Sequence, residues 1–219
     1  MNSLTTITPL LDRLYEEAAI VEPATSAAVA DLSGDELTRL MRSKTGYPDL
    51  YQRLKDFPLA VSRETGALLY MLARGCGART IVEFGTSFGF STLYLAAALR
   101  DNGGGRLITS EFEPSKAERA RQNLTEGGLI DLVEIREGDA LQTLRADLPE
   151  SIDFLLLDGA KALYPEILNL VESRLKPGAL ILADDADESP DYVARVRSQA
   201  VGYMSAPLTA DVELSMRLG

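Results

Sequence analysis

From residue 80 onward, short apolar runs alternate with longer amphipathic stretches, and this alternation limits the possible folds more than any other feature. The runs TIVEF, RLITSEF, IDFLLLD and ALILADD are apolar almost throughout, as is typical of strands that are covered on both faces. Strands are predicted at 80–84, 106–111, 132–136, 152–157 and 178–183, and helices at 90–100, 114–126, 139–146, 161–174 and 190–199. Strands that alternate with helices in this way form a doubly wound, parallel α/β sheet.

The last part of the chain breaks this alternation. Residues 200–206 and 211–218 have the pattern of two strands, and the loop between them is too short for a helix. These two strands must therefore pair antiparallel. The sequence thus predicts a mostly parallel, seven-stranded sheet whose last strand is antiparallel.

The N-terminal part of the chain is predicted to be helical, at about 4–20, 34–43 and 62–73. A less regular region lies before the third helix. Its aromatic residues and Met41 could form a lid over a substrate or could pack against the N-terminal helices, and we favour packing. The aromatic residues are Tyr47, Tyr51 and Phe57. We interpret residues 1–61 as a helical cap and residues 62–219 as the domain that carries the sheet, within one structural domain overall.

The composition excludes several kinds of chemistry. The chain of 219 residues has no histidine, which removes the commonest general base and the commonest transition-metal ligand. A metal site would have to be built from oxygen atoms, which favours Mg²⁺, Mn²⁺ or Ca²⁺ over zinc. The single cysteine, Cys76, cannot form an intrachain disulfide, and this fits a reducing compartment.

The net charge of −11 argues against broad binding to nucleic acid or to an anionic membrane surface. No apolar run approaches the length of a membrane span, and the polar start MNSLTT lacks the pattern of a signal peptide. We therefore expect a cytoplasmic protein with a small-molecule partner, without nucleic acid and without a membrane.

Acidic residues stand at the carboxyl ends of the predicted strands. These ends meet at one edge of a parallel sheet, which is where such sheets bind their ligands. A random distribution of surface acids would not select a single edge, so the sequence predicts a binding site there. The acids are Glu83, Glu111, Asp139, Asp158, Asp184 and Asp185.

The turn after the first of these strands indicates the kind of ligand. Gly85 and Gly89 let the backbone pass close to a ligand, because glycine has no Cβ. The helix that follows offers unpaired N–H groups and the positive end of its dipole. The Glu83 carboxylate would repel a pyrophosphate but suits an ammonium group. This combination points to S-adenosylmethionine (SAM), whose amino-acid end is zwitterionic.

Five motifs follow one another in order. They are Glu-x-Gly-x-x-x-Gly-Phe-Ser from Glu83, then Glu111, Gly138-Asp139-Ala140, Asp158-x-x-Lys161-x-x-Tyr164 and Ala183-Asp184-Asp185. From about Ser62 to the C-terminus, the chain resembles the cation-dependent O-methyltransferases related to catechol and caffeoyl-coenzyme A O-methyltransferases. The resemblance implies a Rossmann-like class I fold, transfer of a methyl group from SAM to a hydroxyl of a small, aromatic acceptor, and a homodimer.

The resemblance also implies roles for individual residues. Glu111 would bind the two ribose hydroxyls, and Asp139 with the backbone of Ala140 would hold the adenine edge. The complete set of implied cofactor-binding residues is Glu83, Gly85, Thr86, Ser87, Gly89, Ser91, Glu111, Gly138, Asp139, Ala140 and Asp158.

A metal site and a general base complete the implied set. Asp158, Asp184 and Asp185 match the positions of the ligands of a divalent cation, Mg²⁺ or alternatively Mn²⁺ or Ca²⁺, although the family usually has asparagine at the last position. Lys161 matches the general base, and Asp158 belongs with it to the implied catalytic residues. A lysine near a metal cation and a sulfonium should have a lowered pKa, because its charged form is disfavoured.

Three alternatives remain open. A methyltransferase of the same fold could work without metal, and its acceptor could be a modified nucleoside in RNA. An NAD-dependent oxidoreductase would share the sheet, the glycine turn and the ribose acid, but the turn lacks a regular dinucleotide spacing. A non-catalytic protein could retain a SAM pocket. The sequence does not identify the acceptor.

Overall fold

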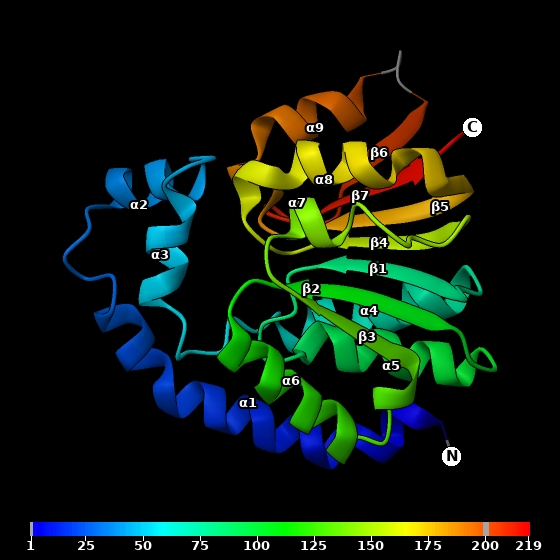
Figure 1. Cartoon of the computed structure of the whole chain (residues 1–219), viewed down its shortest axis with the longest axis horizontal. Helices are drawn as coiled ribbons and strands as arrows, with labels where there is room; N and C mark the ends of the chain where they lie inside the picture. The colour runs from blue at the N-terminus through cyan, green and yellow to red at the C-terminus, as the bar shows by residue number, and fades with distance from the viewer. Residues whose placement is uncertain (1, 199–201) are drawn as a thin grey trace.

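The computed structural model describes residues 2–198 and 202–219. Within them, seven strands form one sheet in the order β3-β2-β1-β4-β5-β7-β6 (Figure 1). Neighbouring strands from β1 to β5 pair parallel, whereas β7 pairs antiparallel with both β5 and β6. The predicted fold class is therefore confirmed. The strands are β1 (Thr80–Phe84), β2 (Arg106–Glu111), β3 (Val133–Glu137), β4 (Ile152–Leu157), β5 (Leu175–Ala183), β6 (Tyr203–Pro207) and β7 (Glu213–Arg217).

Helices cover both faces of the sheet (Figure 1). One face packs against α1, α4, α5 and α6, and the other against α7, α8 and α9. The short helices α2 and α3 stand apart, beside the carboxyl ends of the parallel strands. The helices are α1 (Ser3–Ala27), α2 (Gly34–Met41), α3 (Tyr47–Arg53), α4 (Arg63–Gly75), α5 (Phe90–Asp101), α6 (Pro114–Glu126), α7 (Ala140–Thr143), α8 (Tyr164–Val171) and α9 (Pro190–Arg197).

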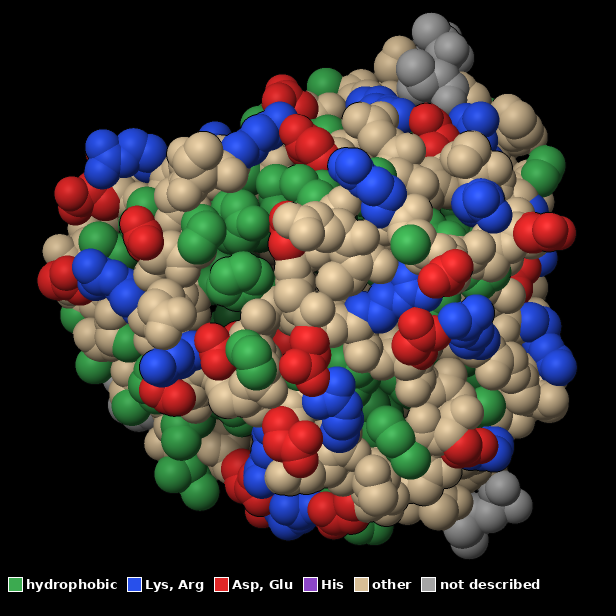
Figure 2. All heavy atoms as spheres, viewed as in Figure 1, with side chains coloured by type: hydrophobic (Ala, Val, Ile, Leu, Met, Phe, Trp, Pro, Cys, Tyr) green, Lys and Arg blue, Asp and Glu red, His purple; other side chains and the backbone are tan. Residues whose placement is uncertain are grey.

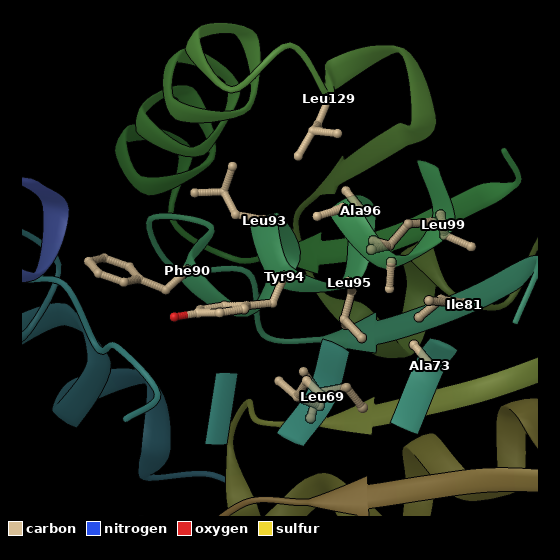
Figure 3. Close-up of a cluster of buried hydrophobic side chains, with 14 of the residues drawn as sticks. Leu69, Ala73, Ile81, Phe90, Leu93, Tyr94, Leu95, Ala96, Leu99 and Leu129 are labelled. Carbon is tan, nitrogen blue, oxygen red and sulfur yellow. The ribbon is translucent and has the colours of Figure 1, made fainter. Parts of the chain in front are cut away.

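The apolar strands place a core on each face of the sheet. Successive side chains of a strand point to opposite faces, so Ile81 joins one cluster while Val82 and Phe84 join the other. Helix α5 is the centre of the first cluster, since all its residues from Phe90 to Leu99 are buried. Figure 3 shows side chains of α5 packed against Leu69, which lies in α4.

Most boundaries of the helices and strands agree with the prediction, but a few elements differ. The predicted helix 139–146 is only one turn long, as α7. The predicted helix 161–174 is divided, because single 3₁₀ turns at 161–163 and 172–174 flank α8. Helix α3 was not predicted, and part of the predicted strand 200–206 lies outside the described residues.

The N-terminal segment contributes directly to the core. Helix α1 is longer than predicted and buries Ile7, Leu10, Leu11 and Leu14 against the cluster around α5. None of the described helices is both long and apolar enough to span a membrane. The first helix is therefore built into the same body as the sheet.

Candidate active site

The turn after β1 is held in a conformation that only glycine adopts easily. Gly85 has a φ of +102°, and a Cβ at this position would lie 2.4 Å from the carbonyl oxygen of Asp158. Gly89 has a φ of +85° and is the N-cap of α5. Gly85 therefore allows the ends of β1 and β4 to approach closely at the rim of the sheet, whereas a Cβ on Gly89 would lie 3.3 Å from the Ala120 Cβ of α6.

Glu83 lies beneath this turn and is completely buried. Its carboxylate accepts hydrogen bonds from the hydroxyls of Ser91 at 2.6 Å and Thr92 at 2.7 Å. Burial raises the pKa of Glu83 to about 7, although these hydrogen bonds oppose the shift. Glu83 thus supports Ser91 from behind and is not among the residues that line the adjacent cavity.

The acids after β2 and β3 both face the cavity. The Glu111 carboxylate accepts hydrogen bonds from the backbone N–H groups of Ser87 at 2.7 Å and Glu113 at 2.9 Å, and burial raises its pKa. Asp139 caps α7 through the N–H of Leu141 at 2.9 Å and also lines the cavity. Capping and ligand binding are therefore compatible at Asp139.

A cavity of about 90 Å³ lies over this rim. It brings together most of the residues expected to bind a cofactor, whereas Glu83 and Gly89 do not line it. The expected residues that do line it are Gly85, Thr86, Ser87, Ser91, Glu111, Gly138, Asp139, Ala140 and Asp158.

Two tyrosines of α3 close this cavity from the side of the N-terminal segment. Tyr47 and Tyr51 line it, and both also pack against the second core cluster. The Tyr51 hydroxyl donates a hydrogen bond to the carbonyl oxygen of Gly159 at 3.3 Å. The interpretation of these rings as packing alone was therefore incomplete, because they also cover a cavity.

Lys116 is a cavity residue that the sequence analysis missed. It lies in the first turn of α6, is 4% exposed, and is the one lysine or arginine among the described residues that line the cavity. Burial lowers its pKa, although the nearby Glu111 carboxylate opposes the shift. A lysine in the first turn of a helix opposes the helix dipole, and this signal was available in the sequence.

A second, larger cavity of about 550 Å³ adjoins the first. Its polar wall contains Lys161, whose Nζ lies 3.0 Å from Asp158 Oδ1 and 3.1 Å from Asp185 Oδ2. Apolar side chains of the N-terminal segment form the opposite wall; they include Val29, Leu37, Met41, Leu50 and Leu54. Figure 2 shows hydrophobic side chains gathered in the hollow between α2–α3 and the body of the protein.

The prediction of a lowered pKa for Lys161 concerns a lysine beside a metal cation and a sulfonium, and the protein groups around Lys161 act by themselves in the opposite direction. Burial alone would lower the pKa, but the Tyr164 hydroxyl and the carboxylates of Asp158 and Asp185 outweigh it and hold the pKa well above its ordinary value. The amine is therefore protonated while it lies between the two acids.

The third predicted metal ligand is close to this pair. Asp184 lines the same cavity, and burial, together with the Asp158 carboxylate, raises its pKa to about 7. Asp211, from the loop between β6 and β7, is a further acid in the lining that the sequence analysis missed. Among the described residues, no group of three or more potential side-chain ligands is arranged to hold a metal ion.

Sequence and structure comparisons place the chain in a known class. A family model described as a methyltransferase domain matches residues 82–186. The O-methyltransferase TomG from Streptomyces achromogenes, involved in tomaymycin synthesis and solved in complex with SAM, is 26% identical with a TM-score of 0.64, and the match covers 93% of this chain and 99% of TomG. The fold and the rim therefore define a SAM-dependent methyltransferase.

Two relatives identify the family more closely. The catechol O-methyltransferase of Mycobacterium tuberculosis is 32% identical over 83% of this chain and 77% of its own length. That of Niastella koreensis is 38% identical, but the match spans only 58% of each protein. The chain belongs to the SAM-dependent O-methyltransferases of the catechol O-methyltransferase type.

Proposed function

We propose that the protein transfers the methyl group of SAM to a hydroxyl of a small acceptor, and that the acceptor occupies the second cavity. The observation that carries this proposal is the contact between the two cavities. Asp158 lines both of them, and Lys161 Nζ lies 3.0 Å from its carboxylate on the side of the second cavity. An acceptor oxygen placed there would adjoin both the cofactor and a buried ammonium.

The first cavity has the chemistry that SAM requires. Glu111 offers two carboxylate oxygens to a ribose, and Asp139 with the Ala140 backbone offers an acceptor and a donor to adenine. The small-residue turn from Gly85 to Ser91 would receive the methionine end. Since Glu83 lies beneath this turn, we infer that it fixes the Ser91 hydroxyl and does not itself grip the ammonium.

The acceptor class follows from the walls of the second cavity. The aliphatic wall suits an apolar body, and the acidic wall with Lys161 suits a hydroxyl group. We therefore infer a small, hydroxylated, aromatic acceptor. Residues 1–61 would then act as a cap that completes its binding site, because the aliphatic wall comes from this segment.

The oxygen donors of this wall suit the chemistry of a divalent cation, although the three acids are not arranged around a common point. To hold a cation, Asp158, Asp184 and Asp185 would have to converge, with Lys161 displaced from between Asp158 and Asp185. Mg²⁺ is the preferred candidate because all the ligands are oxygens. Such an ion would orient the acceptor hydroxyl and lower its pKa. The raised pKa of Asp184 reflects burial first and then the neighbouring Asp158 carboxylate, whose repulsion a cation would relieve.

Lys161 has a role that depends on its partners. While Asp158 and Asp185 pair with it, the ammonium holds a proton and stabilises an ionised acceptor oxygen at Nζ. It would accept a proton only if another cation neutralised those carboxylates, since its pKa would then fall. The bridging ammonium is the observation that favours a metal-independent mechanism as the second candidate.

A labelled-methyl transfer assay with phenolic acceptors tests the proposal, with Mg²⁺ and with a chelator. We expect Lys161→Met to lower kcat at least about tenfold, because a charged hydrogen bond contributes about 1.5–3 kcal/mol, while binding of S-adenosylhomocysteine (SAH) is retained. Lys44→Met, which removes an exposed lysine paired with Glu166, is the control.

The outcomes separate the two mechanisms. Loss of activity in the chelator with recovery on Mg²⁺ supports the cation, and indifference to chelation supports the metal-independent candidate. Tight binding of NAD in place of SAH, measured by calorimetry, would contradict both. The expected homodimer and the cytoplasmic location remain predictions.

A further inference from the structure

Three residues line both cavities: Tyr51, Leu59 and Asp158. They therefore stand where a methyl group would pass from cofactor to acceptor. Leu59 has no polar side-chain atom, and the Asp158 carboxylate already accepts a hydrogen bond from Lys161. Tyr51 thus provides the one hydroxyl at this junction among the described residues.

The Tyr51 hydroxyl makes only a long hydrogen bond, so it can change to another acceptor. It donates to the Gly159 carbonyl oxygen at 3.3 Å, which is beyond the usual range for an O–H donor. A hydroxyl can rotate to a better acceptor without moving its ring. The ring itself is held edge-on to Tyr47, with 6.3 Å between centroids.

The surroundings keep this hydroxyl a donor. Charged groups around it are Lys161, Asp158, Asp185 and Glu111. Burial raises the pKa of Tyr51, so the phenol retains its proton near neutral pH. A neutral donor beside an ionised oxygen forms a charge-assisted hydrogen bond, which is stronger than a neutral one.

We propose that Tyr51 is a further catalytic residue, whose hydroxyl donates a hydrogen bond to the acceptor oxygen and holds it in line with the methyl group. The inference rests on the proposed function. The oxygen–carbon bond forms as the carbon–sulfur bond breaks, and the electron pair of that bond stays on sulfur. The acceptor proton leaves to water, and Tyr51 keeps its own proton throughout.

The test uses Tyr51→Phe in the full chain, which removes the hydroxyl and keeps the ring. We expect kcat to fall about tenfold, because without this hydrogen bond the bound acceptor is less often ionised and less often aligned with the methyl group. The SAH dissociation constant and the acceptor KM should stay within about twofold, because neither ligand depends on this hydroxyl for most of its contacts. Tyr70→Phe is the matched control, since the Tyr70 hydroxyl donates to Asp101 at 2.7 Å and lines neither cavity.

Several results would overturn the inference. An unchanged kcat in Tyr51→Phe removes the hydroxyl from the transfer step, although the proposed function then stands. A parallel loss of SAH affinity, or a lowered midpoint of thermal unfolding relative to Tyr70→Phe, indicates a merely structural role. Absence of methyl transfer by the unmodified protein overturns both proposals.

Discussion

Glu83 is a carboxylic acid enclosed by protein on every side, and its protonation is therefore coupled to folding. Its pKa is about 7 in the folded protein, against about 4.3 in an unfolded chain. Between these values the folded state binds more protons than the unfolded state. The free energy of unfolding consequently falls as the pH rises from about 4.3 to about 7.

Replacement of this acid by Glu83→Gln should remove that pH dependence. At roughly 1.4 kcal/mol for each pKa unit, we expect the unmodified protein to lose about 3–4 kcal/mol between pH 4 and pH 8 through this group. Urea unfolding at the two pH values measures the loss. Asp184 acts in the same direction, so part of the dependence should persist in Glu83→Gln. An unchanged pH dependence would contradict the burial of a titrating acid.

The sequence was sufficient to predict which acids lie together at the rim, but not their protonation states. The order of strand ends was sufficient to place Glu111, Asp139 and Asp158 at one rim. The direction of the Lys161 pKa shift that the protein groups cause could not be inferred from the sequence, because it depends on the distances to two carboxylates from different loops. The burial of the Glu83 side chain in the core beneath the turn was deducible in principle, since Glu83 shares a face of β1 with the buried Ile81.

At the scale of the elements, the approach of β1 to β4 depends on one glycine. The loop after β1 contacts the loop after β4 so closely that Asp158 N donates to the Phe84 carbonyl at 2.8 Å. A side chain at Gly85 would push these loops apart, and Gly85 and Asp158 both line the first cavity, which is the proposed cofactor site. We therefore predict that strand geometry and cofactor binding are coupled at this position.

Gly85→Ala should lower the free energy of unfolding by about 3 kcal/mol and abolish SAH binding, because strain at positive φ adds to overpacking. Gly178→Ala is a suitable control, since it has a φ of +83° but open space where a Cβ would lie. The difference in unfolding free energy between the two variants measures the clash alone. Equal values would show that the contact with Asp158 has no energetic importance.

The bounds of helices and strands were predictable where glycine or proline residues stand at their ends. The bounds of β1, β2, β4 and α6 agree with the prediction, because turn glycines or Pro114 define them. Helix α3 was missed because it has only seven residues and Pro48 stands near its start. So short a helix does not show a recognisable helical periodicity of apolar residues. Strand β5 begins earlier than predicted, since Lys176-Pro177-Gly178 does not have a strand pattern.

At the scale of the whole molecule, the N-terminal helix and the sheet share one hydrophobic core. Residues 1–61 were interpreted as a helical cap within one structural domain, and α1 of this segment packs against α5, which begins at the glycine turn of the site. An exposed ion pair between Arg13 and Glu126, at 2.6 Å, also joins α1 to the end of α6. The stability of the site should therefore depend on residues far from it in the sequence.

Leu11→Ala should destabilise the protein by about 2–5 kcal/mol, because it leaves a cavity at a side chain that is 2% exposed. The same truncation at Ile20, which is 78% exposed, should change the free energy of unfolding by less than about 0.5 kcal/mol. Chemical unfolding of both variants measures the contrast. Similar values would mean that α1 is not part of the core.

The position of α3 bears on how a ligand would enter and leave the first cavity. Tyr47 and Tyr51 of α3 form part of the cavity wall, so an outward displacement of the segment from residue 28 to residue 61 would widen the proposed cofactor site. Since α1 before this segment and α4 after it are both anchored in the core, the segment is fastened at its two ends. Such an opening would therefore stay local, and the two anchors would return the segment to its place.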